Sequence, residues 1–237
     1  MKKLILILLL SFPSNTYAAI AYDAVSEGSA GAGTSITWSH TVATNAHVVM
    51  VGCIYYQKAV DPGLTSCTYN GATLSISPQS PQIDGNANVQ NMYQVYGTVT
   101  GDGGAHNVSC STPSSVDSWT TSFTTYTGAS GTLDSSSKTT NFVATTDTTV
   151  TTTVVANNSW TIGCFRNEVG GATDGAGTTH RGSNGDHTIA DSNGALSAGS
   201  QSLIQNFSSS VNMGAIISIA PFTAATSAFQ LWPLSLF

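Results

Sequence analysis

The chain reads His47-Val48-Val49-Met50-Val51-Gly52-Cys53-Ile54-Tyr55-Tyr56 early in its length, and every residue after the histidine is apolar, aromatic or small. A strand with one face in water alternates apolar and polar residues, because successive side chains point to opposite faces. This stretch does not alternate, and neither does the run from Met213 to Ile219. The sequence therefore predicts two mid-sheet strands whose outer faces are covered by a loop, a third layer or another subunit.

Other short runs of β-branched and aromatic residues lie on both sides of this stretch, separated by clusters of Gly, Asn, Asp, Ser and Pro. Such alternation is typical of strands and turns, and no segment keeps a helical periodicity. Asn70-Gly71 between two runs predicts a type I′ hairpin turn. The expected strands are residues 19–24, 35–42, 47–56, 65–69, 73–77, 89–99, 106–110, 119–126, 141–144, 148–155, 159–166, 202–206 and 211–220. Because the connections are too short for helical crossovers, they predict one antiparallel all-β sandwich domain over residues 19–221.

The chain carries little charge. Only 8% of its residues are charged, against about 25% in an average domain, and the pI is ≈ 5.0. So few cations exclude a phosphate-backbone footprint, and no nucleic-acid partner is expected. Solubility must come from hydroxyls and amides, and the threonine-rich residues 145–153 are expected at a polar edge or outward face. A threonine array binds ice or glycan when it repeats on neighbouring strands, and one row does not establish such a plane.

Residues 1–18 have the organisation of a secretory signal. Two lysines precede the apolar run Leu4 to Leu10, and Tyr17-Ala18-Ala19 supplies a small-residue cleavage site. The apolar run is shorter than the roughly 18 residues that cross a bilayer, so no transmembrane span is expected in the mature chain. We expect cleavage after Ala18 and a protein that is periplasmic, exposed at the cell surface or extracellular.

The four cysteines agree with export, because an even set without a CxxC pair favours disulfides over zinc ligation. Cys53 and Cys164 each follow a glycine within an apolar run. We predict the pairs Cys53–Cys164 and Cys67–Cys110, one of three connectivities that four cysteines allow. The alternative is four buried thiols that behave as small apolar side chains.

The longest stretch without strand signals is residues 170–199, which is rich in Gly, Asn, Asp, Ser and Ala. Loops of this length are uncommon and are often functional. The stretch and the residues just before it collect the ionisable side chains that form the predicted binding site: Arg166, Glu168, Asp174, His180, Arg181, Asp186 and His187. The alternative is a solvated loop with a local arginine–aspartate pair. The spacing of the two histidines matches no recognised ligand pattern, and no metal site is predicted.

Recognised catalytic patterns are missing from the sequence. Glu27 and Glu168 are the only glutamates, and neither has an acidic neighbour at the spacing of paired glycosidase carboxylates. The nucleophile elbow, Walker A, HExxH and EF-hand patterns are also absent. A catalytic triad is a spatial arrangement, however, so the alternative function is a secreted polysaccharide hydrolase with its site in residues 170–199.

Binding is the main functional prediction. Sugars are held by aromatic faces together with amide and carboxylate partners, and the chain supplies all three. Trp119 follows a polar turn and is expected at an exposed rim, whereas Trp160 starts an apolar strand and is expected to be buried. No cofactor is predicted; the alternative is calcium at residues 84–88, whose composition is rich in oxygen ligands.

Residues 222–237 form an apolar tail that ends in Phe229-Gln230-Leu231-Trp232-Pro233-Leu234-Ser235-Leu236-Phe237. We expect this tail to pack on a neighbour. The alternative is a segment donated during assembly, which would make the protein a homo-oligomer.

Several short motifs resemble those of concanavalin-like or jelly-roll sandwiches in secreted bacterial and phage-encoded proteins. They are Ile20-Ala21-Tyr22-Asp23, residues 35–40, the 47–56 strand, Thr68-Tyr69-Asn70-Gly71 and residues 158–163. The resemblance spans residues 20–221 and implies a β-sandwich with a surface or appendage role, without any catalytic residue. The four cysteines do not fit a phage particle assembled in the cytoplasm, because disulfides rarely form in that compartment. The prediction is therefore an exported, non-catalytic module that binds a glycan or another cell-surface component or serves in assembly.

Overall fold

The computed structural model describes residues 18–83, 89–167 and 171–223. All regular structure within these ranges is β, and the strands pair antiparallel in two sheets. The predicted all-β antiparallel fold is therefore confirmed. None of the described residues forms a helix long and apolar enough to cross a membrane.

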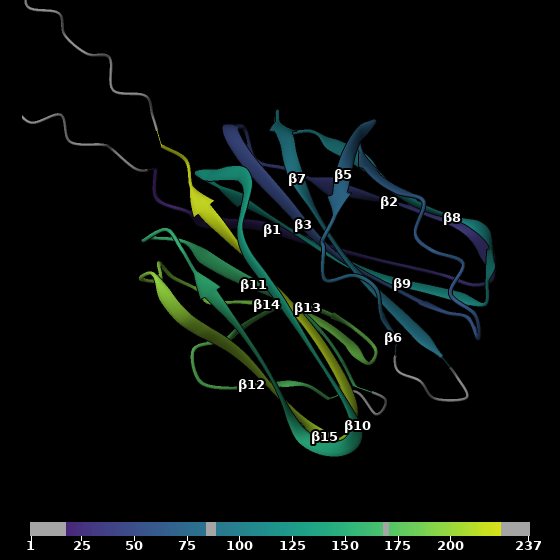
Figure 1. The fold of residues 1–237 in the computed structure, drawn as a ribbon. Coiled ribbons are helices and arrows are strands. Elements are labelled where there is room, and N and C mark those ends of the chain that lie inside the picture. The colour runs from purple at the N-terminus through teal and green to yellow at the C-terminus, as the bar shows by residue number, and fades with distance from the viewer. Residues whose placement is uncertain (1–17, 84–88, 168–170, 224–237) are drawn as a thin grey trace, which may run out of the picture.

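The first sheet almost closes on itself (Figure 1). Its strands are β1 (Ala21–Ala30), β2 (Gly33–Thr41), β3 (Asn45–Gln57), β4 (Ser66–Tyr69), β5 (Ala72–Ile76), β6 (Gln82–Ile83), β7 (Gln90–Gly101), β8 (Ala105–Val116) and β9 (Ser118–Thr127). They follow the order β1-β9-β3-β7-β5-β4-β8-β2, with β6 on β7. Asn70 and Gly71 join β4 to β5 with φ values of 47° and 81°, as the predicted type I′ turn requires.

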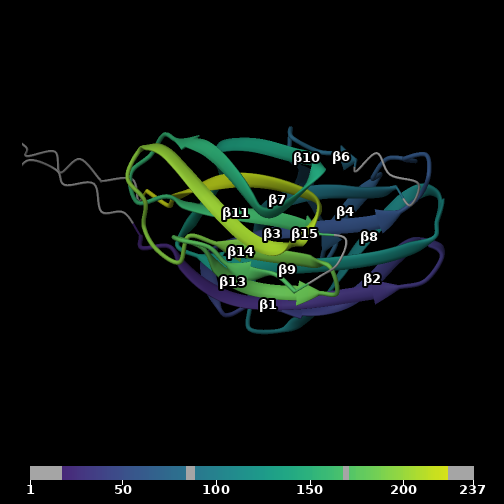
Figure 2. The same ribbon diagram turned by 90° about the horizontal axis from the view of Figure 1, so that it is seen from below.

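The second sheet packs on the outer face of the first (Figure 2). Its strands are β10 (Ala129–Val154), β11 (Trp160–Asn167), β12 (Thr173–Asp174), β13 (Thr179–Asn184), β14 (His187–Asp191) and β15 (Gly199–Pro221). The order is β10-β15-β11-β14-β13, with β12 on β15. The predicted edge position of residues 145–153 is confirmed, because they belong to β10.

The strands β10 and β15 form a long ribbon that folds back over the second sheet. Their pairing runs from Ala129 opposite Pro221 to Val154 opposite Gly199. The two ends of β10 meet, since Thr152 Oγ1 donates to Ser135 Oγ at 2.9 Å. The returning half covers an apolar cluster of the second sheet that includes Val150, Phe165, Ala190, Leu203, Phe207 and Ile216. This ribbon acts as a third layer, which is one of the three coverings expected for the apolar sequence of β15.

Strand β3 is buried on both faces, as predicted. Met50 and Ile54 point into the first sheet's interior cluster, whereas Val49 and Val51 point into the cluster between the sheets. This division follows from the two-residue period of a strand. The strand therefore lies between β9 and β7 and serves two cores at once.

Two disulfides hold different parts of the fold together. Cys53–Cys164 connects β3 to β11 and so joins the two sheets. Cys67–Cys110 connects β4 to β8, which place these residues directly opposite each other. This is the pairing expected from the sequence, and two disulfides agree with an oxidising compartment.

Side chains bridge the two strands at which the first sheet closes. Trp38 Nε1 of β2 donates to Ser26 Oγ of β1 at 3.0 Å, and His40 Nδ1 lies 2.7 Å from the same hydroxyl. His40 Nε2 lies 3.3 Å from Thr125 Oγ1, which donates to Asp23. Burial lowers the pKa of His40 to about 4, against the smaller opposing effect of Asp23. A neutral imidazole that accepts at Nδ1 and donates at Nε2 satisfies this chain of contacts.

The expectation of a loop over residues 170–199 is wrong. The described residues of this range include β12, β13 and β14. Strand β14 is buried along its whole length between β11 and β13, although His187-Thr188-Ile189-Ala190-Asp191 reads as a polar turn region. The carboxylate of Asp191 finds partners on β9 and β13, which no local pattern records.

Candidate functional site

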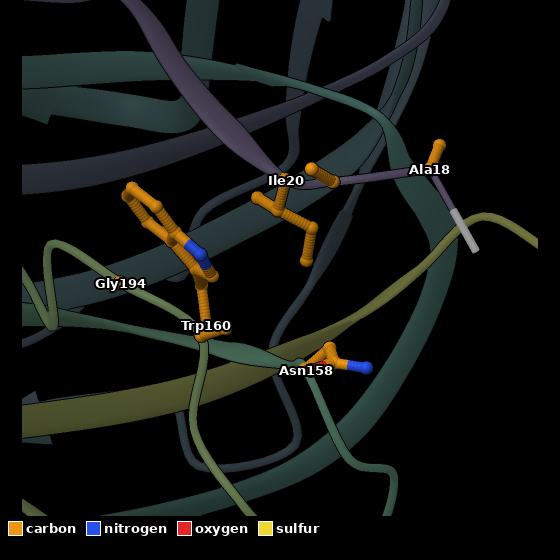
Figure 3. A pocket seen from close by; sticks show the side chains of 7 residues that line it. Ala18, Ile20, Asn158, Trp160 and Gly194 are labelled. Carbon is orange, nitrogen blue, oxygen red and sulfur yellow. The ribbon is translucent and has the colours of Figure 1, made fainter.

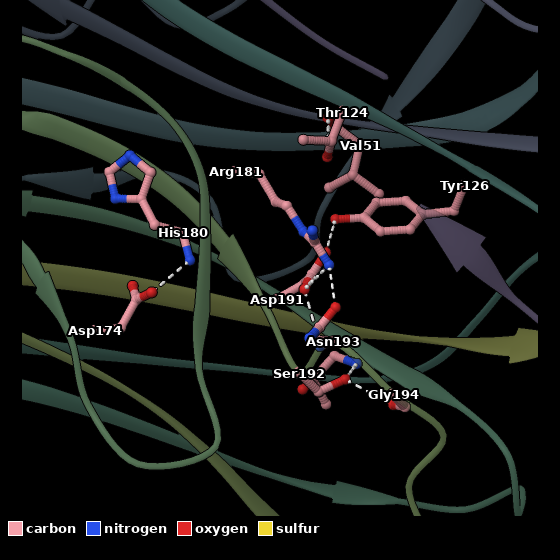
Figure 4. A network of polar contacts seen from close by, with 11 residues as sticks. Val51, Thr124, Tyr126, Asp174, His180, Arg181, Asp191, Ser192, Asn193 and Gly194 are labelled. Carbon is pink, nitrogen blue, oxygen red and sulfur yellow. Dashed lines mark hydrogen bonds and ion pairs between the residues drawn. The ribbon is translucent and has the colours of Figure 1, made fainter. Parts of the chain in front are cut away.

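The predicted site residues do not form one site, and the largest group is a buried network around Asp191 (Figure 4). Arg181 binds this carboxylate through two nitrogens, with Nε to Oδ2 at 2.7 Å and Nη2 to Oδ1 at 3.0 Å. The hydroxyl of Tyr126 donates to Oδ2 at 2.9 Å, and the backbone N–H of Asn193 donates to Oδ1 at 2.9 Å. We call these four residues the arginine network. Asp191 is 0% exposed, so all of its acceptor capacity is used inside the protein.

The arginine network connects the two sheets. Tyr126 belongs to β9 of the first sheet, whereas Arg181 and Asp191 belong to β13 and β14 of the second. The Arg181 guanidinium also lies 4.2 Å from the ring centre of Tyr22 on β1, a cation–π contact. Burial opposes the charge of Arg181, and hydrogen bonds and the charge of Asp191 outweigh it, so its pKa is raised. Burial also raises the pKa of Tyr126 well above its usual value, which keeps this phenol a donor.

A second cluster lies on β11, β14 and the turn before β14. Asp186 Oδ1 is 2.8 Å from His187 Nδ1, and Asp186 Oδ2 is 3.5 Å from Arg166 Nε. The His187 ring packs on Tyr55 with ring centres 3.9 Å apart, and the Tyr55 hydroxyl donates to two backbone carbonyls. Burial acts to raise the pKa of Asp186, but His187 and Arg166 lower it more, so the carboxyl stays ionised. These contacts attach β14 to the first sheet.

Asp174 and His180 make contacts of their own, separate from those within the two clusters. Asp174 accepts from the backbone N–H of His180 at 3.0 Å and from Gln205 Nε2 at 3.0 Å. His180 and Asp186 line a cavity of only about 90 Å³, whereas ligand pockets have volumes of about 300–1,000 Å³. Glu168 and the proposed calcium segment 84–88 lie outside the described residues.

The expectation that Trp119 lies at an exposed rim is wrong. Its side chain is 1% exposed, packs edge-on against Tyr56 and donates from Nε1 to the backbone carbonyl of Gly33 at 3.2 Å. The polar turn before it does not keep it in solvent, because β9 turns its side chain into the interior of the first sheet. Trp160 is buried, as predicted.

A different region has the open, polar geometry of a binding surface. The fold-back of β10 encloses a groove of about 280 Å³ that is lined only by hydroxyl side chains: Ser135, Ser136, Ser137, Thr151, Thr152 and Thr153. We call it the hydroxyl groove. Thr151 and Thr153 are exposed, whereas Thr152 is buried against Ser135. Thr151 Oγ1 also lies 2.7 Å from Ser202 Oγ on β15.

The hydroxyl groove continues onto a second row of polar residues. In the ladder between β10 and β15, Thr153 is opposite Ser200 and Thr151 is opposite Ser202, and all four side chains are exposed. The threonine row of β10 is visible in the sequence. The second row, Ser200 and Ser202 on β15, is placed beside it by the pairing register of the two strands. The lining on the opposite side comes from Ser135 to Ser137, which no strand signal in the sequence marked.

Within the described part of the chain, no group of three or more His, Cys, Asp or Glu side chains is placed to hold a metal ion. No protein-family model, curated protein or solved structure matches this chain.

Proposed function

We propose that this protein is an exported, non-catalytic binding module of the jelly-roll or concanavalin-like sandwich class, and that its hydroxyl groove binds a neutral glycan. The observation that carries this proposal is the groove itself, whose six lining residues are all serines and threonines without formal charge, with the Thr151 and Thr153 side chains exposed. The proposed compartment is the periplasm, the cell surface or the extracellular medium. The two disulfides are consistent with each of these.

The chemistry of the lining favours a polyhydroxylated ligand. A serine or threonine hydroxyl has one donor and two acceptor positions, and a single contact inside the protein leaves the remaining positions for a ligand. The bond between Thr151 and Ser202 fixes one such hydroxyl in place without using all of its capacity. Sugar hydroxyls have the same mixed donor and acceptor character, whereas an anionic ligand would need cations that this lining lacks.

The contacts of the ionisable side chains support a non-catalytic role over the hydrolase alternative. Arg181 is committed to Asp191, and Asp186 is committed to His187 and Arg166. Asp174 and His180 contact each other only through a backbone N–H. These contacts stabilise the strands that replace the expected loop. Among the residues that the structure describes, they leave no pair of facing carboxylates around a sugar-sized cavity.

The test is binding to an array of neutral polysaccharides, followed by calorimetry on each ligand found. We expect the double variant Thr151→Val, Thr153→Val to weaken binding roughly 30-fold, because each lost hydrogen bond contributes about 1 kcal/mol. The matched control is Thr149→Val, since Thr149 is exposed on the same face of β10 outside the groove. Equal affinities of the double variant and the wild type would contradict the proposed groove. Release of soluble sugar from a polysaccharide would instead favour the hydrolase.

A further inference from the structure

An apolar cavity of about 390 Å³ lies at the end of the molecule where the described chain starts and finishes. Ile20 and Trp160 face each other across it, and Asn158 lies beside them (Figure 3). The remaining lining consists of alanine and glycine, including Ala18 and Ala195. Asn158 is thus the one polar side chain in the lining, and the cavity suits a large apolar side chain better than a polar ligand.

The C-terminal segment begins next to this cavity. The backbone N–H of Ala18, a lining residue, donates to the carbonyl of Phe222 at 3.0 Å. The backbone N–H of Phe222 donates to Gly128 at 2.8 Å, and its ring stacks on His47 with centres 3.4 Å apart. These contacts fix the point at which the chain continues into residues 224–237, which lie outside the described part.

The sequence of this segment needs an apolar partner. Its last nine residues contain six large apolar side chains: Phe229, Leu231, Trp232, Leu234, Leu236 and Phe237. Leaving them in water forfeits about 25 cal/mol for each Å² of apolar surface. The chain from Thr223 to Phe229 can span roughly 20 Å, because an extended residue covers about 3.3–3.6 Å. The cavity beside Ala18 is therefore within reach of the tail of the same molecule.

We propose that residues 229–237 dock on this cavity in the same molecule, with the Trp232 side chain inserted against Trp160. Two indoles pack well edge to face, and a buried indole N–H requires an acceptor, which the Asn158 amide can supply. The tether favours the intramolecular contact, because a short linker gives an effective concentration of about millimolar. This contact is independent of the hydroxyl groove, which lies on the β10–β15 ribbon.

The first test is hydrogen exchange of the chain purified after export. Its first residue after the predicted cleavage is Ala19, so it lacks the Ala18 contact but keeps the other six lining residues and the contact of Phe222 with Gly128. We expect the amides of residues 229–237 to exchange at least about tenfold more slowly than in a free peptide of the same sequence. The variant Ala195→Trp fills the cavity and should return them to the peptide rate. The matched control Ala198→Trp places the same side chain at an exposed position of the same loop outside the lining. Its tail should remain protected.

The possible results distinguish the tail of the same molecule from the tail of a second copy and from an unoccupied cavity. Peptide-like exchange in the wild type, or protection that survives Ala195→Trp, overturns the proposal. Protection that disappears on dilution together with a dimer in light scattering also overturns it, because the occupant is then the tail of a second copy.

A fluorescence measurement keeps the proposal testable if Ala195→Trp fails to fold. Trp160 is already buried within the described residues, so the readout is Trp232 itself. We expect the emission of Trp232, taken as the difference between the full chain and its variant Trp232→Phe, to be quenched by acrylamide several-fold less than the emission of a free peptide of residues 224–237. Equal quenching of Trp232 in the chain and in the peptide contradicts docking.

Discussion

The arginine network and the hydroxyl groove are both polar regions of the second sheet, but they differ in their relation to solvent. In the arginine network, Asp191 receives four hydrogen bonds and is fully buried. In the hydroxyl groove, Thr151 and Thr153 are exposed and keep unused hydrogen-bonding capacity. The comparison shows that Arg181 and Asp191, two ionisable residues of the second sheet, bind each other inside the protein, whereas the hydroxyls of Thr151 and Thr153 remain accessible to solvent.

The reason for this division is the cost of burying charge. An ionised side chain between two sheets is tolerated only with a complete set of partners, and removal of one partner leaves the other charge unpaired. A hydroxyl at the surface has no such requirement and remains free to exchange water for a ligand. We therefore expect the region between the sheets to govern stability and the groove to contribute little to it.

The largest effect is expected for the disulfide between the sheets. The double variant Cys53→Ala, Cys164→Ala opens a loop of 111 residues and should lower the free energy of unfolding by about 5 kcal/mol. The variant Cys67→Ala, Cys110→Ala opens a loop of 43 residues, and the same relation gives about 4 kcal/mol. Urea unfolding of both variants measures these losses. A smaller loss of unfolding free energy for Cys53→Ala, Cys164→Ala than for Cys67→Ala, Cys110→Ala would show that the disulfide between the sheets is not the more stabilising one.

Removal of the central carboxylate of the arginine network comes next. Asp191→Ala leaves the Arg181 charge without its partner between the sheets, and we expect a loss of about 3–5 kcal/mol. For a chain of this size the melting temperature should fall by roughly 10 °C.

The matched control for this variant is Asp117→Ala. Asp117 forms an exposed ion pair with Lys58 at 3.4 Å, and surface pairs contribute under about 1 kcal/mol. Equal losses for the two aspartates in thermal melts would contradict a structural role for the network.

The third effect depends on pH and comes from His40. The imidazole of the unfolded chain takes up a proton below about pH 6.5, whereas the folded chain does so only near pH 4. Stability that is present above pH 6.5 is therefore lost as the pH falls towards 4, by up to about 3 kcal/mol. In His40→Gln this part of the loss should disappear, and unfolding curves at pH 7.5 and pH 4 measure it. Parallel pH dependences for variant and wild type would refute the assignment.

The smallest effect on stability is expected in the hydroxyl groove. Thr151→Val and Thr153→Val exchange one β-branched residue for another at exposed strand positions, so unfolding should change by less than about 0.5 kcal/mol. Thermal melts of the double variant test this expectation alongside the binding measurement. A loss comparable to that of Asp191→Ala would mean that these hydroxyls are part of the core.

The sequence predicted the features that depend on local chemistry. Continuous apolar runs placed β3 and β15 mid-sheet, and Asn70-Gly71 gave the type I′ turn because both residues tolerate positive φ. The pairing of Cys53 with Cys164 also followed from the similar design of their two strands. Residues 129–140 and β14 were missed, since polar strands show no hydrophobic period and form only where a neighbouring strand supplies hydrogen bonds.

The amino-acid sequence by itself determined the all-β class, the low charge and the number of cysteines available for disulfides. Only the tertiary structure decided that Arg181 meets Asp191 under Tyr126, and that Ser135 meets Thr152 across the fold-back of β10. Propensity and periodicity act over a few neighbouring residues, whereas these contacts join strands through layer packing and register. A buried charge pair and an open hydroxyl groove therefore arise from equally polar stretches of sequence.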